Sequence, residues 1–373
     1  MRIVLLLCVF CLLPLALAQE DDFTHVDYWP REWVYDEKEI LWFHVSDELL
    51  VVCREDGEIS CWGIKDGKHV STFAENDYLP NSHSLFLSSG PLPTLGVLSN
   101  DGNGNVFLRV LDLPSGDERK EISGSATIRA LGNGFDRSGT RFFCYSPYGR
   151  SVYCIDITEG KLLWEAKYKD EYEKRGSVQC FADGERFATF FGKQIVMYDK
   201  DGKSTWVKEL RREYCEASGN KPGDSLLMCW TINLDSEKAR VVAVDKEGKT
   251  IWESPEAPYM DIDLLAVSTD GMRQAFRVKD GVVLTALPKK DAVNVSVDGN
   301  VDVVLTPNGK YLVTLPSLEE VEEDEERNTI TWRRKSHKVT VFDASNGKEL
   351  RSWELVSMES QDEEEDIGEG TGD

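Results

Sequence analysis

The stretch Val152-Tyr153-Cys154-Ile155-Asp156-Ile157-Thr158-Glu159-Gly160-Lys161-Leu162-Leu163-Trp164 returns several times along this chain. It consists of an apolar run, an aspartate, a glycine a few positions later and a second run that contains a tryptophan. Close copies occupy residues 195–206, 241–252 and 339–348. Because self-similarity at a fixed period is the sequence signature of repeat architectures, this unit decides the fold.

Weaker copies extend the series to seven units. They occupy residues 59–68 and 106–116, and a degenerate copy at residues 281–287 has lost its turn glycine. The turn glycines are Gly67, Gly116, Gly160, Gly202, Gly248 and Gly347. Neighbouring units lie roughly 40 to 50 residues apart, which is the length of a four-stranded propeller blade.

A second turn signal precedes several copies, at residues 136–144, 182–189, 268–275 and 306–313. Each contains a glycine that can supply a positive φ and is followed by a short apolar run. Each unit therefore predicts two hairpins, as a four-stranded antiparallel sheet requires. We assign a structural role in the repeat to Asp156, Gly160, Trp164, Asp199, Gly202, Trp206, Asp245, Gly248, Trp252, Asp343 and Gly347.

The Asp-x-x-x-Gly-Lys-x-x-Trp phrase resembles the repeat of pyrroloquinoline-quinone-type propellers. The turn at residues 308–312 also looks like that of WD-repeat propellers, although no Trp-Asp dipeptide occurs. The resemblance implies an all-β fold, a single seven-bladed β-propeller of four-stranded antiparallel blades over residues 38–356. Trp164, Trp206 and Trp252 are expected to fill the space between blades, since large aromatics dominate core burial.

The two ends of the chain differ from the repeats. Residues 1–18 read as a secretory signal peptide that ends in a small-x-small cleavage site, which predicts a secreted or periplasmic protein. A retained anchor is the alternative, and no later segment is apolar enough to span a membrane. Residues 19–37 form an N-terminal segment, whose part from Phe23 to Tyr35 is expected to add an outer strand to the last blade and close the ring. Residues 357–373 read as an acidic disordered tail.

The formal net charge of −24 argues against nucleic acid as a partner, because such binding needs basic patches. We expect instead a protein or glycan partner at a face of the propeller; the sequence does not give the oligomeric state. Residues 318–327 contain a dense acidic run, interpreted as a solvated loop in the last blade. Calcium binding is the alternative there, although the run lacks the ligand spacing of a calcium loop.

The cysteines of the mature chain suggest disulfides, since an exported compartment permits them. Cys53 and Cys61 flank one predicted turn, and Cys144 and Cys154 flank another, so each pair could meet across a hairpin. Cys215 and Cys229 are a third candidate pair. The alternative is that all are small buried hydrophobic residues.

Asn294 begins an Asn-x-Ser sequence that fits a glycosylation acceptor, which matters only in a eukaryotic secretory pathway. A chance match is the alternative.

No catalytic, cofactor-binding or metal-ligating residue can be assigned from the sequence. Quinoprotein dehydrogenases, which the repeat resembles, carry a vicinal Cys-Cys pair and a set of calcium ligands, and no Cys-Cys dipeptide occurs here. The sequence therefore favours a non-catalytic exported scaffold without a cofactor. One alternative is an enzyme in the propeller channel that uses a quinone or Ca²⁺. The other is an envelope assembly factor, which the missing lipid-attachment cysteine weakens.

Overall fold

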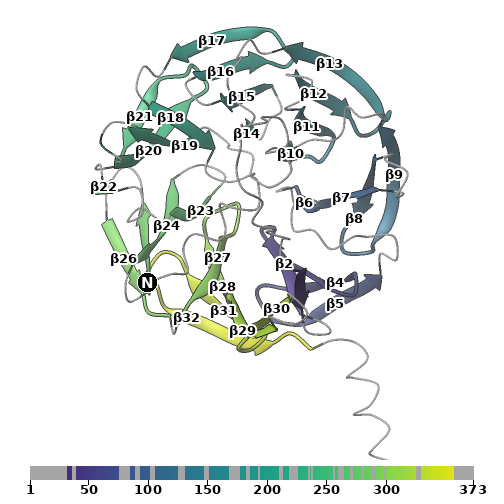
Figure 1. Ribbon diagram of the computed structural model, residues 1–373, viewed down its shortest axis with the longest axis vertical. Helices are drawn as coiled ribbons and strands as arrows, with labels where there is room; N and C mark the ends of the chain where they lie inside the picture. Colours follow the sequence, from purple (N-terminus) through teal and green to yellow (C-terminus); the bar gives the residue numbers. More distant parts are fainter. Residues whose placement is uncertain are drawn as a thin grey trace, which may run out of the picture.

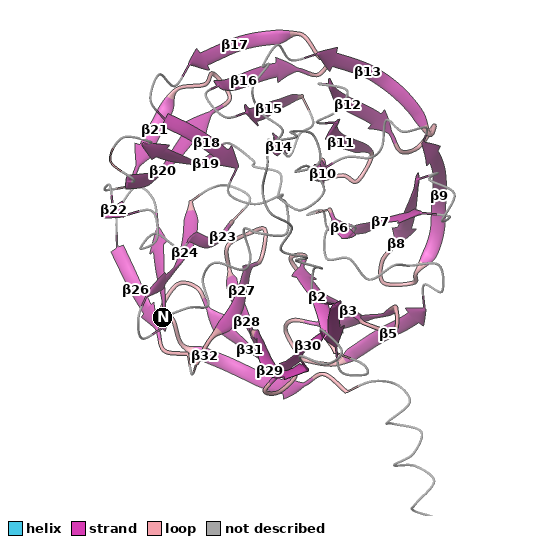
Figure 2. Ribbon diagram, viewed as in Figure 1, coloured by secondary structure: helices cyan, strands magenta, loops and turns pink. Residues whose placement is uncertain are grey.

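The computed structural model describes residues 32–35, 39–74, 85–88, 93–100, 106–124, 131–146, 151–167, 177–181, 185–191, 194–209, 213–217, 226–233, 236, 238–254, 257–258, 264–268, 272–278, 281–286, 291–297, 299–324 and 329–356. These residues form strands and turns and no helix (Figure 2), so among them no helix could cross a membrane. The predicted signal peptide and acidic tail lie outside them. The strands form sheets arranged as a ring (Figure 1).

The first four blades follow one another along the chain. The first contains β2 (Ile40–Val45), β3 (Leu49–Arg54), β4 (Glu58–Gly63) and β5 (His69–Ala74). The second contains β6 (Leu85–Leu87), β7 (Thr94–Asn100), β8 (Val106–Asp112) and β9 (Asp117–Gly124). The third contains β10 (Leu131–Phe135), β11 (Arg141–Ser146), β12 (Ser151–Asp156) and β13 (Lys161–Lys167). The fourth contains β14 (Ser177–Cys180), β15 (Arg186–Phe191), β16 (Gln194–Asp199) and β17 (Ser204–Glu209).

The remaining sheets complete the ring. One contains β18 (Glu213–Ala217), β19 (Leu226–Asn233), β20 (Lys238–Asp245), β21 (Thr250–Glu253) and the short β22 (Ala257–Pro258). The next contains β23 (Leu264–Val267), β24 (Arg273–Val278), β25 (Gly281–Ala286) and β26 (Asp291–Val295). The last blade contains β27 (Val301–Leu305), β28 (Tyr311–Pro316), β31 (Lys338–Asp343) and β32 (Glu349–Glu354).

The structure confirms an all-β propeller with four-stranded antiparallel blades and corrects the predicted count of seven such blades. Within the described residues, six ring sheets have four strands, and the sheet of β18 to β22 has five. The cause is the length of β20, whose first residues Lys238 and Ala239 extend beyond β21 and pair with β22 instead.

Two strands of the last blade are separated by an insertion. β29 (Leu318–Asp324) and β30 (Thr329–Arg334) form an antiparallel hairpin between β28 and β31. β1 (Glu32–Tyr35) pairs with β30 in parallel, which gives a three-stranded sheet, here called the insert sheet. The described part of the N-terminal segment, Glu32–Tyr35, therefore joins the inserted hairpin, and the outer strand of the last blade is β32. Residues 23–31 of this segment lie outside the described residues.

The third strand of a blade is more buried than the fourth, which explains why the third strand is a continuous apolar run and the fourth contains many charged residues. In the third blade, β12 is buried along its first five residues because its two faces lie against neighbouring blades, whereas most of β13 is exposed. A β-bulge accompanies the glycine turn between such strands at six places, for example a register shift between Cys154 and Ile155 of β12. The pair β25–β26, from the copy that lost its glycine, has a regular register. The glycine turn and the β-bulge therefore occur together, and the copy that lacks the glycine also lacks the bulge.

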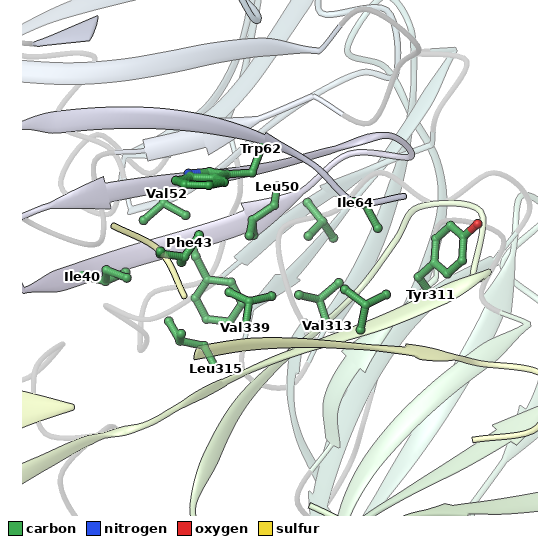
Figure 3. Close-up of a cluster of buried hydrophobic side chains, with 13 residues drawn as sticks. Ile40, Phe43, Leu50, Val52, Trp62, Ile64, Tyr311, Val313, Leu315 and Val339 are labelled. Atoms are coloured by element: carbon green, nitrogen blue, oxygen red, sulfur yellow. The ribbon is translucent and has the colours of Figure 1, made fainter. Parts of the chain in front are cut away.

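The ring closes by side-chain packing between the first blade and the last, a contact that we call the seam. Its apolar cluster combines Phe43, Leu50 and Trp62 of the first blade with Val313 and Val339 of the last (Figure 3). Asn308 N also donates to Asp47 Oδ1 at 2.8 Å, which links turns of the two blades. Each of these blades takes its ring strands from one end of the chain alone.

Candidate functional site

The repeat aspartates hold the turns between third and fourth strands. Asp199 Oδ1 accepts hydrogen bonds from the backbone N–H groups of Asp201 at 3.1 Å and Lys203 at 2.9 Å. Gly202 N donates to Asp199 O at 3.0 Å, and Gly202 has a φ of 76°, which favours glycine. The same arrangement recurs at Asp156 with Gly160, Asp245 with Gly248 and Asp343 with Gly347.

The repeat tryptophans pack on the turn glycines of the next blade. Trp164 of β13 lies over Gly202, where an added Cβ would come 2.8 Å from the indole ring. Trp164 Nε1 donates to Lys200 O of the same turn at 2.6 Å. Trp206 lies over Gly248 in the same way, and Trp252 packs against the cluster of Val241 and Ala243 with residues of the following blade. The tryptophans therefore lie between blades.

The same contact occurs at the seam. Trp353 of β32, in the last blade, lies over Gly67, which is in the turn between β4 and β5 of the first blade. The side chain of Trp353 is packed against the seam cluster. The first and last blades are therefore joined by the same contact of a tryptophan with a turn glycine that joins other neighbouring blades.

Arginines make a second inter-blade contact, which sequence reasoning missed. Arg186 donates to Lys246 O, and Arg273 Nη1 donates to Ala344 O at 2.5 Å, each in a turn of the next blade. Both arginines begin the second strand of their sheets, in a Gly-x-Arg sequence, and this spacing is the signal that could have revealed them. In the last blade the corresponding residue is Tyr311, so the seam is held differently.

A charged cluster, which we call the seam clasp, also joins the first and last blades, at the ends of their strands away from Tyr311. Glu39 is 1% exposed, and its carboxylate accepts hydrogen bonds from Ile40 N at 2.9 Å and Arg334 N at 3.0 Å. His337 Nε2 lies 3.0 Å from Glu39 Oε1. Burial raises the pKa of Glu39, but these hydrogen bonds to His337, Arg334 and Ile40 outweigh it, and the pKa is lowered.

The clasp contains two buried arginines that reach across the seam. Arg334, 5% exposed, donates from Nε to Ile40 O at 3.0 Å and from Nη1 to Asp302 Oδ2 at 2.5 Å and to Pro316 O. Arg54, 1% exposed, donates from Nη2 to Leu355 O at 2.8 Å and from Nε to Glu58 Oε1 at 3.2 Å. Since these charged groups bind one another and backbone carbonyls, we assign them the structural role of holding the first and last blades together. They lie outside the repeat, so no pattern marks them.

The structure shows no disulfide at Cys53, Cys61, Cys144, Cys154 or Cys229, so it does not support the first two predicted pairs. In β3 and β4, Cys53 lies opposite Ile59 and Cys61 opposite Val51, so the two cysteines are diagonal neighbours rather than a pair. Diagonal side chains are too far apart for the Cβ separation that a disulfide needs.

The Cys144–Cys154 pair fails for a related reason, and the Cys215–Cys229 pair stays a prediction. Cys144 lies opposite Tyr153, next to Cys154, so the two side chains of this pair belong to opposite faces of the sheet and to different apolar clusters. Cys215 lies opposite Thr231, and Cys229 opposite Ala217. Burial raises the pKa of Cys61 to about 11 and those of Cys144 and Cys154 to about 12.

Two further sequence predictions concern surface positions. Asn294 is exposed on the outer strand β26, together with Ser296 of the same motif. The acidic run at residues 318–327 was expected to be a loop, but its first part forms the strand β29. An edge strand tolerates such charge because one of its neighbours is solvent. Among the described residues, no group of three or more His, Cys, Asp or Glu side chains could hold a metal ion.

Comparison with known proteins agrees with this architecture. Residues 103–263 match the sequence profile of the family described as outer membrane protein assembly factor BamB. A solved chain titled Kuenenia stuttgartiensis hydrazine synthase is similar in structure, with a TM-score of 0.52 and 12% sequence identity. That match covers 85% of this chain and 99% of the other, and it shows the fold alone. The search of curated proteins found no match.

Together, the family match and the structural neighbour support a β-propeller of the pyrroloquinoline-quinone-type superfamily.

Proposed function

We propose that this chain is an exported, non-catalytic β-propeller that binds a protein partner, in an assembly-type role. The observation that carries the proposal is the match of residues 103–263 to the BamB assembly-factor family. A role in assembling outer-membrane proteins lies outside the cytoplasm, which agrees with the secretory signal read in residues 1–18. We also infer seven blades in the ring, with the sheet of β18 to β22 as the fifth.

The partner is expected at the end of the ring opposite to the glycine turns. At the glycine-turn end, turns of adjacent blades are bonded to one another, as Asn308 to Asp47 and Arg273 to Ala344. The outer strands of the blades finish at the other end of the ring, and the sequence between β5 and β6 and between β13 and β14 is longer than a glycine turn. Longer surface connections on a rigid scaffold are where binding residues concentrate.

The experiment is capture of the partner from intact cells. The chain would be expressed with its own leader and a C-terminal tag, cross-linked before lysis and purified under denaturing conditions. We expect to recover an envelope or extracellular protein in stoichiometric amount. We also expect N-terminal sequencing to show that the mature chain begins at Gln19.

Two charge-reversal variants locate the binding end. The variant Lys169→Glu with Lys174→Glu reverses two charges in the sequence between β13 and β14, where we propose that the partner binds, and is expected to lose the partner. Glu159→Arg with Lys161→Glu exchanges an exposed ion pair at the glycine-turn end and is expected to keep it. A cytoplasmic location, a glycan as the sole ligand, or a tightly bound quinone seen by absorbance and mass would each contradict the proposal.

A further inference from the structure

The outer strands that follow the glycine turns can be compared with one another within this chain. At each of the six β-bulges, one residue of the outer strand has no partner on the third strand, so the ladder does not depend on its side chain. In chain order these extra residues are Val70, Arg119, Leu163, Thr205, Ile251 and Leu350, and all are exposed. Because arginine and threonine occupy this position in two blades, the fold does not require an aliphatic residue there.

The third blade also differs from the others at the position before the bulge residue. Leu162 is 55% exposed and Leu163 is 45% exposed, and within the described residues they are the only adjacent pair of exposed large apolar side chains. The other five blades with this bulge have a polar residue in place of Leu162, namely His69, Glu118, Ser204, Thr250 and Glu349. The leucine pair is therefore a feature of β13 alone, which lies on the outer circumference of the ring (Figure 1).

The glycine turn beside the leucines is not covered by an aromatic ring. Rings of the preceding blades lie over Gly67, Gly116, Gly202 and Gly248. At Gly160 an added Cβ would come 2.8 Å from Cε of Lys120, so a flexible lysine side chain takes the place of the ring. Neither leucine belongs to an apolar cluster of the described residues. Burial of this pair therefore needs a surface from outside its own copy of the chain.

The charges along β13 indicate which surface fits. Lys161 lies two residues before Leu163, and Glu165 lies two residues after it. Lys161 also pairs with Glu159, and Glu165 accepts a hydrogen bond from Ser151, but both side chains remain exposed. A two-fold axis at Leu163 would place Lys161 of each copy opposite Glu165 of the other, with the leucines in contact. Such self-complementarity is what an isologous interface requires, whereas a partner of one charge would oppose Lys161 or Glu165 with a like charge.

We propose that β13 is a self-association surface, through which two copies of this chain form a two-fold dimer, rim to rim. Leu162 and Leu163 form the centre of the contact, and the pairs of Lys161 with Glu165 set its orientation. A standard interface buries roughly 800 Å² per partner, and this patch of four residues is smaller, so the dimer forms reversibly. The surface lies on the circumference and does not depend on a partner at an end of the ring.

The first test is sedimentation velocity of the mature chain over a wide range of concentration, with a variant taken from another blade. Leu162→Ser with Leu163→Thr installs the pair that the fourth blade has at Ser204 and Thr205, which the same turn accepts. We expect a reversible dimer whose dissociation constant rises at least about tenfold in this variant, because each copy loses two buried leucines. Ile251→Thr, at the bulge of the fifth blade, is the control and should leave the dimer unchanged. A monomer at every concentration, or equal weakening by both variants, would overturn the proposal.

The second test exchanges the two charges. Lys161→Glu alone and Glu165→Lys alone each place like charges opposite one another at both ends of the contact, and each should weaken the dimer about three- to tenfold. The combined variant restores opposite charges and should recover the dimer. A combined variant as weak as the single variants, with unchanged thermal unfolding, would overturn the two-fold contact. Species larger than a dimer that grow with concentration would also overturn it, because they indicate an open rather than a two-fold contact.

Discussion

Gly202 and Gly299 have nearly the same backbone conformation in very different surroundings. Their φ angles are 76° and 74°, but Trp164 lies over Gly202, whereas an added Cβ at Gly299 would meet nothing within 4 Å. Gly299→Ala should cost only the left-handed backbone penalty of about 1–2 kcal/mol. Gly202→Ala should cost about 2–4 kcal/mol, because the overlap with Trp164 adds to it. Chemical denaturation of both variants measures the difference, and equal losses would show that Trp164 moves aside freely.

The cysteines yield a prediction about reactivity. With pKa values of about 12, the thiols of Cys144 and Cys154 are roughly 10⁻⁴ to 10⁻⁵ ionised at pH 7.5. We therefore expect them to resist a thiol-specific disulfide reagent in the folded chain and to react within minutes in guanidinium chloride. Peptide mapping of the labelled sites is the measurement. Rapid labelling of either residue in the folded chain would contradict the described burial.

The cysteines also show that the sequence pattern does not specify the register between neighbouring strands. The residues on either side of a turn were correctly placed on adjacent strands, but the register depends on turn geometry. A shift of one residue moves a side chain to the other face of a sheet, as for Cys144 and Cys154. The repeat positions were predictable because each recurs with its own turn, whereas a disulfide needs a distance that no repeat supplies.

At the scale of the element, the insert hairpin carries Arg334, one of the two buried arginines that reach across the seam. Arg334→Ala leaves the carboxylates of Glu39 and Asp302 without this partner, and removal of one member of a buried pair costs about 3–5 kcal/mol. Lys335→Ala is the matched control one residue further on. Its ion pair with Glu319 is exposed, and its loss should cost less than about 1 kcal/mol. Urea unfolding compares them, and similar losses would mean that the clasp contributes no more than a surface pair.

The same clasp predicts part of the acid sensitivity of the chain. The pKa of Glu39 is lowered in the folded state, so its ionised form stabilises the fold at pH values above the unfolded pKa of about 4.5. That contribution is lost as the pH falls through the lower folded pKa. Glu39→Gln should therefore flatten the fall of unfolding free energy between pH 5 and pH 3.

A control variant at an exposed glutamate tests whether this effect is specific to Glu39. Glu159→Gln, at an exposed ion pair, should leave the slope unchanged. The unfolding free energy would be measured across the pH range for all three proteins. A slope in Glu39→Gln as steep as in the unaltered chain would assign the acid sensitivity to other groups.

Elements of the insert sheet were beyond prediction for a physical reason. Ring strands are marked in the sequence by alternation and repetition, and β29 has neither, because an edge strand rich in glutamate does not need a buried face. β1 pairs with residues almost the whole chain away, and no local pattern encodes a partner at that separation. By contrast, the strands of the ring were predictable since each copy repeats the same turn and the same buried third strand.

At the scale of the whole molecule, the blade count required more than periodicity. The copy at residues 281–287 forms β25 in its own sheet, although its turn glycine is lost, so the period was a reliable guide. The extra strand β22 arises from the length of β20, which the repeat phrase does not specify. Periodicity thus predicts the ring, while departures from the repeat have to be observed.

The way in which the ring closes has a consequence for gene order. Each ring sheet is assembled from one continuous stretch of chain apart from the inserted hairpin, and Trp353 on Gly67 repeats at the seam the contact found between other blades. The ring strands of the first and last blades share no peptide segment, so no particular blade has to be synthesised first. A gene that begins at a different blade, with the last blade joined directly to the first, is therefore expected to encode the same ring.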